Sequence, residues 1–370
     1  MKAFLHTALV VAGRGLLAVA PLFMVACEEP LPPVPGYVAD SGIVMDAEPV
    51  FWLDDRRVLF MRMELVDRSK GREGGVKHLL TVWHTDTGEV EKIDHGYWGR
   101  FCASPATDTV SYTSGYLGEG AKAENIYAIG PFGRGQRYVR REDPESKDKI
   151  FSVFSCRFVK RPAWLRGQIV QPLLPGDGYM DLGLWGPNRP EKVTVRYYPE
   201  GSDRGTPVPF TARQPRSDCA QYYPFKGAYF FSGCHTNETD ATVCEPAWWF
   251  WPRELRWEKL CLPFGMENTS VVPTKLGLVL NHRAIARGGG VKEAGVFLFT
   301  GGRKIRLVAG FAGHVAASPD GCKVAFPLQP DIRSALAFKP HTVRPWEPSV
   351  RMIDLCVHKD AILSLPDQRS

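Results

Sequence analysis

Hydrophobic and polar residues alternate along short segments of this chain, and glycine or proline interrupts the pattern at close intervals. The 370 residues include 36 Gly and 30 Pro, and the segments between them are rich in Val, Ile, Tyr, Phe and Trp. Alternation with a period of two, bounded by turn-forming residues, is typical of β-strands. Because no long stretch keeps a period of 3.6 with capping residues, we predict strands and tight turns with few, short helices.

One pattern recurs along the chain: an apolar strand, a tight polar turn and a second, alternating strand. A second hairpin follows several copies, for example at 78–93 and 296–308. The copies lie at 49–63, 101–115, 155–170, 219–234, 270–282 and 314–329. Their equivalent positions Val50, Phe101, Ser155, Ala220, Val271 and His314 are 51, 54, 65, 51 and 43 residues apart. A repeat of this length predicts an array of similar units.

Two hairpins per unit make a four-stranded blade, and blades around an axis leave only short, protected strand edges. We therefore predict an all-β fold, a β-propeller of six four-stranded blades spanning 43–362, followed by a C-terminal tail at 363–370. Seven blades or tandem β-sandwich domains are the alternatives.

The last copy carries the motif Ser318-Pro319-Asp320-Gly321, and the strand 350–355 follows it. This arrangement resembles the repeat of TolB-type six-bladed propellers. The other copies depart from the motif, since Leu53-Asp54-Asp55-Arg56 keeps only an acid and 226–229 keeps only Gly227. The resemblance implies the fold and says little about function, because one fold hosts many activities.

The first 26 residues are typical of a secretory signal, with Lys2 and Arg14 before a twelve-residue apolar stretch. That stretch is shorter than the roughly 20 residues of a membrane-spanning helix. The segment Met24-Val25-Ala26-Cys27 resembles the bacterial lipobox, which implies cleavage before Cys27 and acylation of Cys27. An ordinary secreted protein cut near Ala26 is the alternative.

We expect the acylated Cys27 to hold the protein in a lipid bilayer. Glu28 follows it, and in the enterobacterial sorting rule this implies the outer membrane, facing the periplasm. Residues 27–42 are rich in proline and predict an extended tether rather than a packed element.

The chain has nine cysteines, and removing Cys27 leaves an even number. Export to an oxidising compartment would allow these eight to form four disulfides. Their positions in the predicted blades suggest, without settling, the pairs Cys102–Cys156, Cys219–Cys261, Cys234–Cys244 and Cys322–Cys356. Because no two cysteines have CxxC spacing, a metal site is not expected.

Net charge and catalytic motifs give little further information about the function of this chain. The formal net charge of +6 falls to +4 without the signal, which does not indicate nucleic-acid binding. Neither GxSxG nor HExxH occurs. Asp54 and Asp55 lie in a predicted turn, where carboxylates usually satisfy local backbone donors. We expect no enzyme, no cofactor and no metal; His314, which opens a predicted innermost strand, is a possible binding residue.

The segment 247–257 holds four tryptophans in eleven residues. Exposed, they could anchor a partner; buried, they would fill the space between blades. Alternation places Trp249 and Trp251 on one face of a strand and Trp248 and Phe250 on the other. The possible binding residues in this segment are Trp248, Trp249, Trp251 and Trp257.

These observations together predict an envelope lipoprotein whose propeller binds another envelope protein. One alternative is an immunity or inhibitor lipoprotein against an envelope-targeted toxin. Another is a propeller hydrolase or lyase acting on envelope glycans or peptides.

Overall fold

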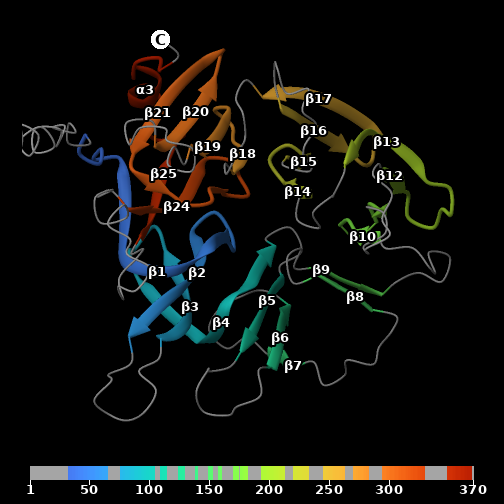
Figure 1. Cartoon of the computed structure of the whole chain (residues 1–370), viewed down its shortest axis with the longest axis horizontal. Helices are drawn as coiled ribbons and strands as arrows, with labels where there is room; N and C mark the ends of the chain where they lie inside the picture. Colours follow the sequence, from blue (N-terminus) through green and yellow to red (C-terminus); the bar gives the residue numbers. More distant parts are fainter. Residues whose placement is uncertain are drawn as a thin grey trace, which may run out of the picture. The chain divides into compact units, whose positions relative to one another are not determined.

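The computed structural model describes much of the chain that follows the predicted signal. It describes residues 32–65, 76–104, 109–114, 124–129, 138–140, 149–152, 157–160, 170–174, 176–181, 193–212, 220–232, 245–262, 270–282, 294–329 and 348–368. These ranges fold almost entirely as antiparallel β-sheet, with a short helix, α3 (Lys359–Leu363), near the C-terminus (Figure 1). No helix in these ranges is long and apolar enough to cross a membrane. The all-β prediction is confirmed for the described part of the chain.

The first predicted hairpins form, and they belong to one continuous run of antiparallel strands. Each strand of this run pairs with the next one in sequence. Gly88, at φ +76°, lies in the predicted turn between the third and fourth strands, where a left-handed conformation favours glycine. The strands are β1 (Val38–Trp52), β2 (Arg57–Leu65), β3 (Val76–His84), β4 (Val90–Ser104), β5 (Thr109–Ser114), β6 (Glu124–Ile129) and β7 (Tyr138–Arg140).

Three further sheets have four strands each, again in sequence order. The first contains β10 (Val170–Pro172), β11 (Tyr179–Asp181), β12 (Val193–Tyr198) and β13 (Thr206–Ala212). The second contains β14 (Ala220–Tyr223), β15 (Ala228–Phe231), β16 (Glu245–Trp251) and β17 (Arg256–Leu262). The third contains β18 (Val271–Pro273), β19 (Leu278–His282), β20 (Gly295–Thr300) and β21 (Arg303–Ala309).

The predicted hairpin at 155–170 lies largely outside the described residues, and its described parts pair with other segments. Arg157–Lys160 forms β9, which pairs back with β8 (Lys149–Ser152), whereas β10 pairs with β11. The long interval between Ser155 and Ala220 thus contains the whole β10–β13 sheet, which the count of six units leaves out. The repeat was missed because β10 and β11 have only three residues each, too few to show an alternating pattern.

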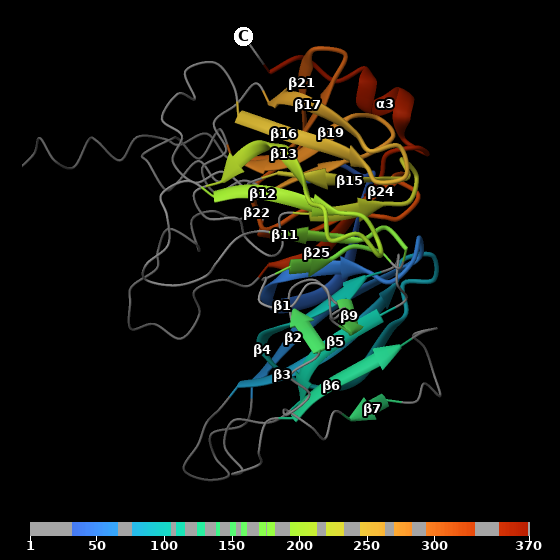
Figure 2. The same ribbon diagram turned by 90° about the vertical axis from the view of Figure 1, so that its right-hand side faces the viewer.

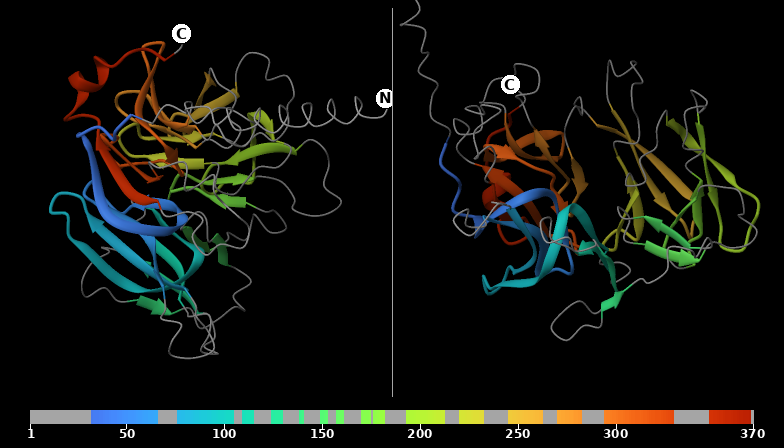
Figure 3. Two further views of the ribbon diagram at one scale, coloured as in Figure 1. Left: turned by 60° about the vertical axis from the view of Figure 1, so that its left-hand side comes forward. Right: turned by 60° about the horizontal axis from the view of Figure 1, so that its bottom comes forward.

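The C-terminal strands form a sheet that the first strand of the chain completes. Its members are β22 (Phe311–Ala312), β23 (Ala316–Ala317), β24 (Lys323–Gln329) and β25 (Ser349–Asp354). The first half of β1 pairs with β25, from Val38 opposite Ile353 to Val44 opposite Ser349. Figure 3 shows this blue strand beside the red one. The second half of β1 pairs with β2, so the first and last sheets share one strand.

Side chains reinforce this connection between the two ends of the domain. Arg351 and Asp40 lie directly opposite each other, and their side chains form an ion pair of 2.8 Å. The indole nitrogen of Trp52 donates a hydrogen bond of 2.9 Å to the Ala316 carbonyl. Because these contacts join residues far apart in sequence, closure depends on the whole intervening chain having folded.

The folded sheets extend beyond the predicted domain limits. β1 begins at Val38 rather than after residue 42, so the predicted tether is shorter than expected. At the other end, Gln368 donates a backbone hydrogen bond of 2.7 Å to Lys304, and Asp367 bridges to Ile305. The predicted C-terminal tail therefore runs along the edge of β21, beside which α3 also lies (Figure 2).

Hydrophobic clusters lie between sheets that follow one another in sequence. One joins β10–β13 to β14–β17, and the largest joins β14–β17, β18–β21 and the C-terminal sheet. Another joins β24 and β25 to β1, β2 and β3, and a fourth links β1–β3 with β4 and β5. Each of these sheets is therefore stabilised mainly by apolar burial against its neighbours.

Candidate functional site at a junction of turns

Four turns from different sheets meet at Ser318–Gly321, the turn between β23 and β24. We call these four turns the turn junction. The other three are the β1–β2 turn (53–56), the β14–β15 turn (224–227) and the β18–β19 turn (274–277). The other three turns each lie between the first two strands of their sheets, and the Ser318–Gly321 turn follows the short strands β22 and β23, which both pair with β24. The hairpin repeat itself thus brings turns of this kind to the same end of neighbouring sheets.

The Ser318–Gly321 turn is held by its own side chains. The Ser318 hydroxyl donates to Oδ1 of Asp320 at 2.6 Å and accepts from the backbone N–H of Lys323 at 2.8 Å. The same Oδ1 accepts from the backbone N–H of Cys322 at 3.0 Å. Gly321 completes the turn at φ +72°. Local sequence therefore dictates the conformation of this turn.

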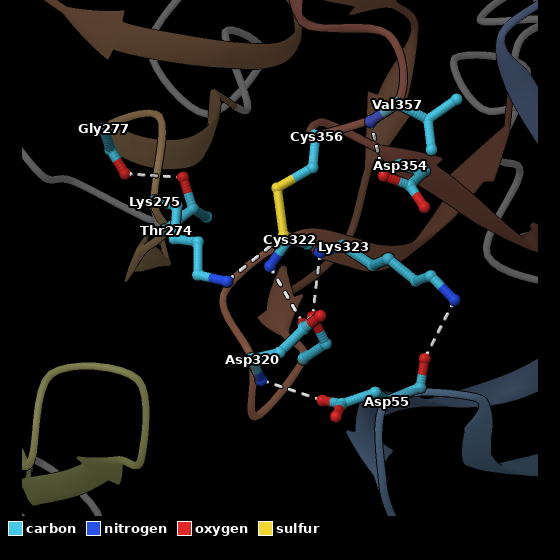
Figure 4. Close-up of a disulfide and its surroundings, with 11 residues drawn as sticks. Asp55, Thr274, Lys275, Gly277, Asp320, Cys322, Lys323, Asp354, Cys356 and Val357 are labelled. Atoms are coloured by element: carbon cyan, nitrogen blue, oxygen red, sulfur yellow. Dashed lines mark hydrogen bonds between the residues drawn. A yellow bond between two sulfur atoms is a disulfide. The ribbon is translucent and has the colours of Figure 1, made fainter.

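The β1–β2 turn presents two aspartates with different roles. Asp54 accepts from the backbone N–H groups of Arg56 and Arg57, both at 2.9 Å, as expected of a turn carboxylate. Asp55 instead accepts from the backbone N–H of Asp320 at 2.8 Å (Figure 4). The expectation of a purely local role is correct for Asp54 and wrong for Asp55, which joins the first sheet to the last.

Burial is the largest influence on the Asp55 carboxyl and raises its pKa above the ordinary value for aspartate. The hydrogen bond from Asp320 opposes this shift, while the negative charges of Asp320 and Asp54 add to it. Lys323 also opposes the shift, and its ammonium donates to the Asp55 carbonyl at 2.9 Å. The hydrogen bond from Asp320 and the charge of Lys323 thus partly offset the cost of burying the carboxylate.

Lys323 is the basic centre of this contact, with 15% of its side chain exposed. Its Nζ lies 3.4 Å from Oδ1 of Asp86, in the β3–β4 turn. Oδ2 of Asp86 lies 3.3 Å from Nε of Arg56, whose side chain is 78% exposed. Charges therefore alternate from the buried side of the junction to its surface.

Two other turns contact the same loop through their backbones. Lys275 N–H donates to the Gly321 carbonyl at 2.9 Å, and Phe225 N–H donates to the Pro319 carbonyl at 3.3 Å. The Phe225 ring covers Gly321 so closely that a Cβ there would lie 2.7 Å from Cδ1 of the ring. Position 321 therefore requires glycine both for its left-handed backbone and for this packing.

A disulfide between Cys322 and Cys356 ties the turn to the end of β25 (Figure 4). It is one of the four pairs suggested by sequence position. The Lys275 ammonium lies 3.6 Å from the Cys322 sulfur. Cys27 and the side chains of the other predicted cysteines, Cys102, Cys156, Cys219, Cys234, Cys244 and Cys261, lie outside the described residues.

The polar side chains of the turn junction make structural hydrogen bonds and ion pairs. The carboxylates of Asp55 and Asp320 accept hydrogen bonds from backbone and hydroxyl donors, and Lys323 binds a carbonyl and a carboxylate. In the described part of the chain, no group of three or more His, Cys, Asp or Glu side chains is placed to hold a metal ion. The described side chains of the turn junction thus hold the four turns in defined positions.

The tryptophans lie elsewhere, in the core. Trp248, Trp249 and Trp251 are each less than 9% exposed, and they pack on opposite faces of β16 as alternation predicts. Trp257 is partly buried and stacks on Phe250, with ring centroids 4.0 Å apart. The possible binding role of these four residues is not supported by their burial, since they fill the space between sheets.

His314 is exposed, and it lies between β22 and β23 rather than opening the innermost strand. Its neighbour Val315 donates a backbone hydrogen bond of 2.7 Å to the Ser270 hydroxyl.

The sequence analysis did not identify five residues as members of one site: Asp55, Asp86, Phe225, Lys275 and Lys323. The signal available was that all lie in or beside predicted turns of the same kind, which the repeat brings to one end.

No known protein family and no curated protein match this sequence. Among solved structures, the β-propeller domain of the Trilobed protease from Pyrococcus furiosus is 9% identical with a TM-score of 0.33; the match covers 78% of this chain and 79% of that one. Pyrococcus horikoshii acylaminoacyl peptidase is 10% identical with a TM-score of 0.33, covering 77% and 42%. A chain of the Mitotic Checkpoint Complex is 10% identical with a TM-score of 0.35, covering 89% and 98%. At these values the similarities assign this chain no activity or partner.

Proposed function

We propose that this protein is a bacterial envelope lipoprotein whose sheets form a β-propeller that serves as a rigid protein-binding platform. The turn junction carries the proposal. Its turns come from four sheets, and each is fixed to the Ser318–Gly321 turn by hydrogen bonds. A preorganised surface loses little conformational entropy when a partner binds, which suits a platform.

The propeller is supported by the order of the sheets. Consecutive sheets share hydrophobic clusters, and β1 belongs to both the last sheet and the first. A closed ring protects the strand edges that separate sheets would leave open. Counting β8–β9 as part of a unit and adding the β10–β13 sheet, we propose seven blades in place of six.

The lipid anchor rests on the sequence Met24-Val25-Ala26-Cys27. Two or more acyl chains on one cysteine would hold the protein stably, since each buried methylene contributes roughly 0.8 kcal/mol. The test is to fractionate cells that express the wild type or Cys27→Ser. We expect the wild type in the membrane fraction and the variant in the soluble fraction; a variant that stayed with membranes would refute the anchor.

The platform is tested by affinity purification of the lipidated protein from solubilised membranes after mild cross-linking. We expect a stoichiometric partner, and we expect less of it with Lys226→Glu and Lys275→Glu, two exposed lysines of the junction. Lys92→Glu, an exposed lysine of β4, is the matched control. A partner retained equally by all variants would remove the junction from the proposal, and the absence of any stoichiometric partner would refute the platform.

A further inference from the structure

The chain enters the folded domain at the end that carries the turn junction. Val38 pairs with Ile353, and Lys323 pairs with Asp354, so the start of β1 and the start of β24 lie at the same end of the last sheet. Tyr37 precedes β1, and its hydroxyl donates a hydrogen bond of 2.7 Å to the Leu307 carbonyl. From this residue onward the path of the chain is fixed.

Two exposed apolar side chains belong to the same end. Val357, 74% exposed, directly follows Cys356 and its disulfide to the junction. Leu255, 55% exposed, lies in the β16–β17 turn. This turn is at the junction end because Phe250 pairs with Tyr229, the second residue after the 224–227 turn. A third exposed apolar residue, Val44, is 37% exposed and lies opposite Ser349, at the far end of the last sheet.

Leu255 is unusual in a second way. Its φ is +49°, and among the described residues it alone combines a positive φ with a side chain. A bulky residue in the left-handed region costs roughly 1–2 kcal/mol relative to the right-handed one. Exposure of its side chain adds a second unfavourable feature to the same position. Strained residues that persist in a fold often lie at functional surfaces, and here the exposed group is apolar.

The predicted tether is short compared with the sheets. Val34, seven positions after Cys27, already packs against the core. An extended proline-rich segment of that length spans roughly 22 Å. The seven residues of β24 span about 23 Å along the strand. A tether that starts at the junction end would therefore have to lie fully extended along the sheets to bring their far end to the bilayer, whereas the junction end meets no such constraint.

We propose that this end of the domain lies against the bilayer in which Cys27 is anchored, with Leu255 and Val357 in the lipid interface. The inference rests on the proposed lipid anchor and adds the orientation of the domain. Arg253 and Arg256 flank Leu255, and both are exposed. Arg256 is paired with Glu254 at 3.1 Å and with Glu258 at 3.4 Å, so Arg253 is the side chain that can meet a phosphate headgroup. The bilayer occupies the surface around Leu255 and Val357, and a partner bound at the turn junction, which lies at the same end, must therefore bind close to the membrane.

The test uses the full lipidated protein in vesicles of phosphatidylethanolamine and phosphatidylglycerol. An azide-bearing amino acid replaces Leu255, Val357 or Val44 in turn and is coupled to a dye that nitroxide lipids quench. Because quenching requires proximity to the interface, we expect about threefold or more stronger quenching at positions 255 and 357 than at 44. Equal or stronger quenching at position 44 would overturn the orientation.

Two controls separate this proposal from the anchor. Flotation of the wild type with vesicles, and its loss in Cys27→Ser, report on the anchor alone. A wild type that floats while the probes at 255 and 357 remain unquenched refutes the orientation and leaves the anchor standing. A wild type that does not float refutes both. Hydrogen exchange on unlabelled protein guards against effects of the dye: we expect vesicles to slow exchange in 252–255, and unchanged exchange there would count against the contact.

Discussion

Asp55 accepts a hydrogen bond of 2.8 Å from the backbone N–H of Asp320, a residue 265 positions later in the chain. The contact joins the turn of the first hairpin to the turn of the last sheet. It coincides with the pairing of β1 with both β2 and β25, so backbone and side chains close the domain at the same place.

Replacing Asp55 separates its hydrogen bond from its charge. Asp55→Asn keeps an oxygen acceptor for Asp320 N–H, whereas Asp55→Ala leaves that donor unpaired. We expect Asp55→Ala to lower the free energy of unfolding at neutral pH by about 1–2 kcal/mol and Asp55→Asn to change it by less than about 0.5 kcal/mol. Denaturant unfolding measures both. Equal losses in the two variants would show that the charge, not the hydrogen bond, matters.

A comparison of the wild type with Asp55→Asn at different pH values also reports the direction of the Asp55 pKa shift. Because burial raises this pKa in the folded state above its ordinary value of 3.8, the carboxyl ionises more readily in the unfolded state. Any stability that the protonated carboxyl contributes is present below the ordinary value and is lost as the pH rises through the raised value. We expect the stability of the wild type relative to Asp55→Asn to fall over that interval. A rise there would contradict the direction of the shift.

Lys323 is expected to matter more than the neighbouring Arg56. Lys323→Met removes the donor to the Asp55 carbonyl and leaves that oxygen in a partly buried site, so we expect a loss of about 1–3 kcal/mol in the free energy of unfolding. Arg56→Gln removes only an exposed ion pair with Asp86, and we expect less than about 1 kcal/mol. Chemical denaturation at two salt concentrations measures both losses. Similar values would mean that Lys323 acts only through Asp86.

Gly321→Ala tests the contact with Phe225. Gly42 is the matched control, because its φ of +69° is close to the +72° of Gly321 while a Cβ at position 42 would meet no atom within 4 Å. We expect about 1 kcal/mol of destabilisation for Gly42→Ala, from backbone strain alone, and about 2–4 kcal/mol for Gly321→Ala. A double-mutant cycle with Phe225→Ala should recover part of the excess. Equal losses at the two glycines would show that the ring moves aside without cost.

Tyr197 predicts sensitivity to alkali. Its hydroxyl donates to the Asp177 carbonyl at 2.7 Å, and burial, followed by the charges of Asp177 and Glu200, raises its pKa from 10.0 to about 12. The stability that the neutral phenol contributes is therefore present below pH 10.0 and is lost as the pH rises toward about 12. We expect Tyr197→Phe to lower the free energy of unfolding by about 1 kcal/mol at neutral pH. Between pH 10.0 and about 12, the free energy of unfolding of this variant should fall less steeply with pH than that of the wild type. Identical alkaline profiles for the two proteins would contradict the assignment.

The sequence by itself determined much of the local structure. Alternation placed the hairpins of the first, fifth and last copies, the Ser318–Gly321 motif placed its turn, and the two faces of the tryptophan strand followed from a period of two. These features depend on neighbouring residues, so they can be recognised in the order of the chain. The β10–β13 sheet was not recognised as a unit of its own for the same reason, because its first two strands have only three residues each and carry almost no periodic signal.

Tertiary structure decided which of these local features meet. Nothing near Asp55 in sequence indicates Asp320, and nothing near Val38 indicates Ile353, because both contacts form only when the remaining sheets have brought the two ends together. Burial decided that Trp248, Trp249 and Trp251 belong to the core, a question that alternation leaves open when both faces of a strand are covered. The sequence thus determined the turns and strands, and the packing of successive sheets determined that the turns form one site.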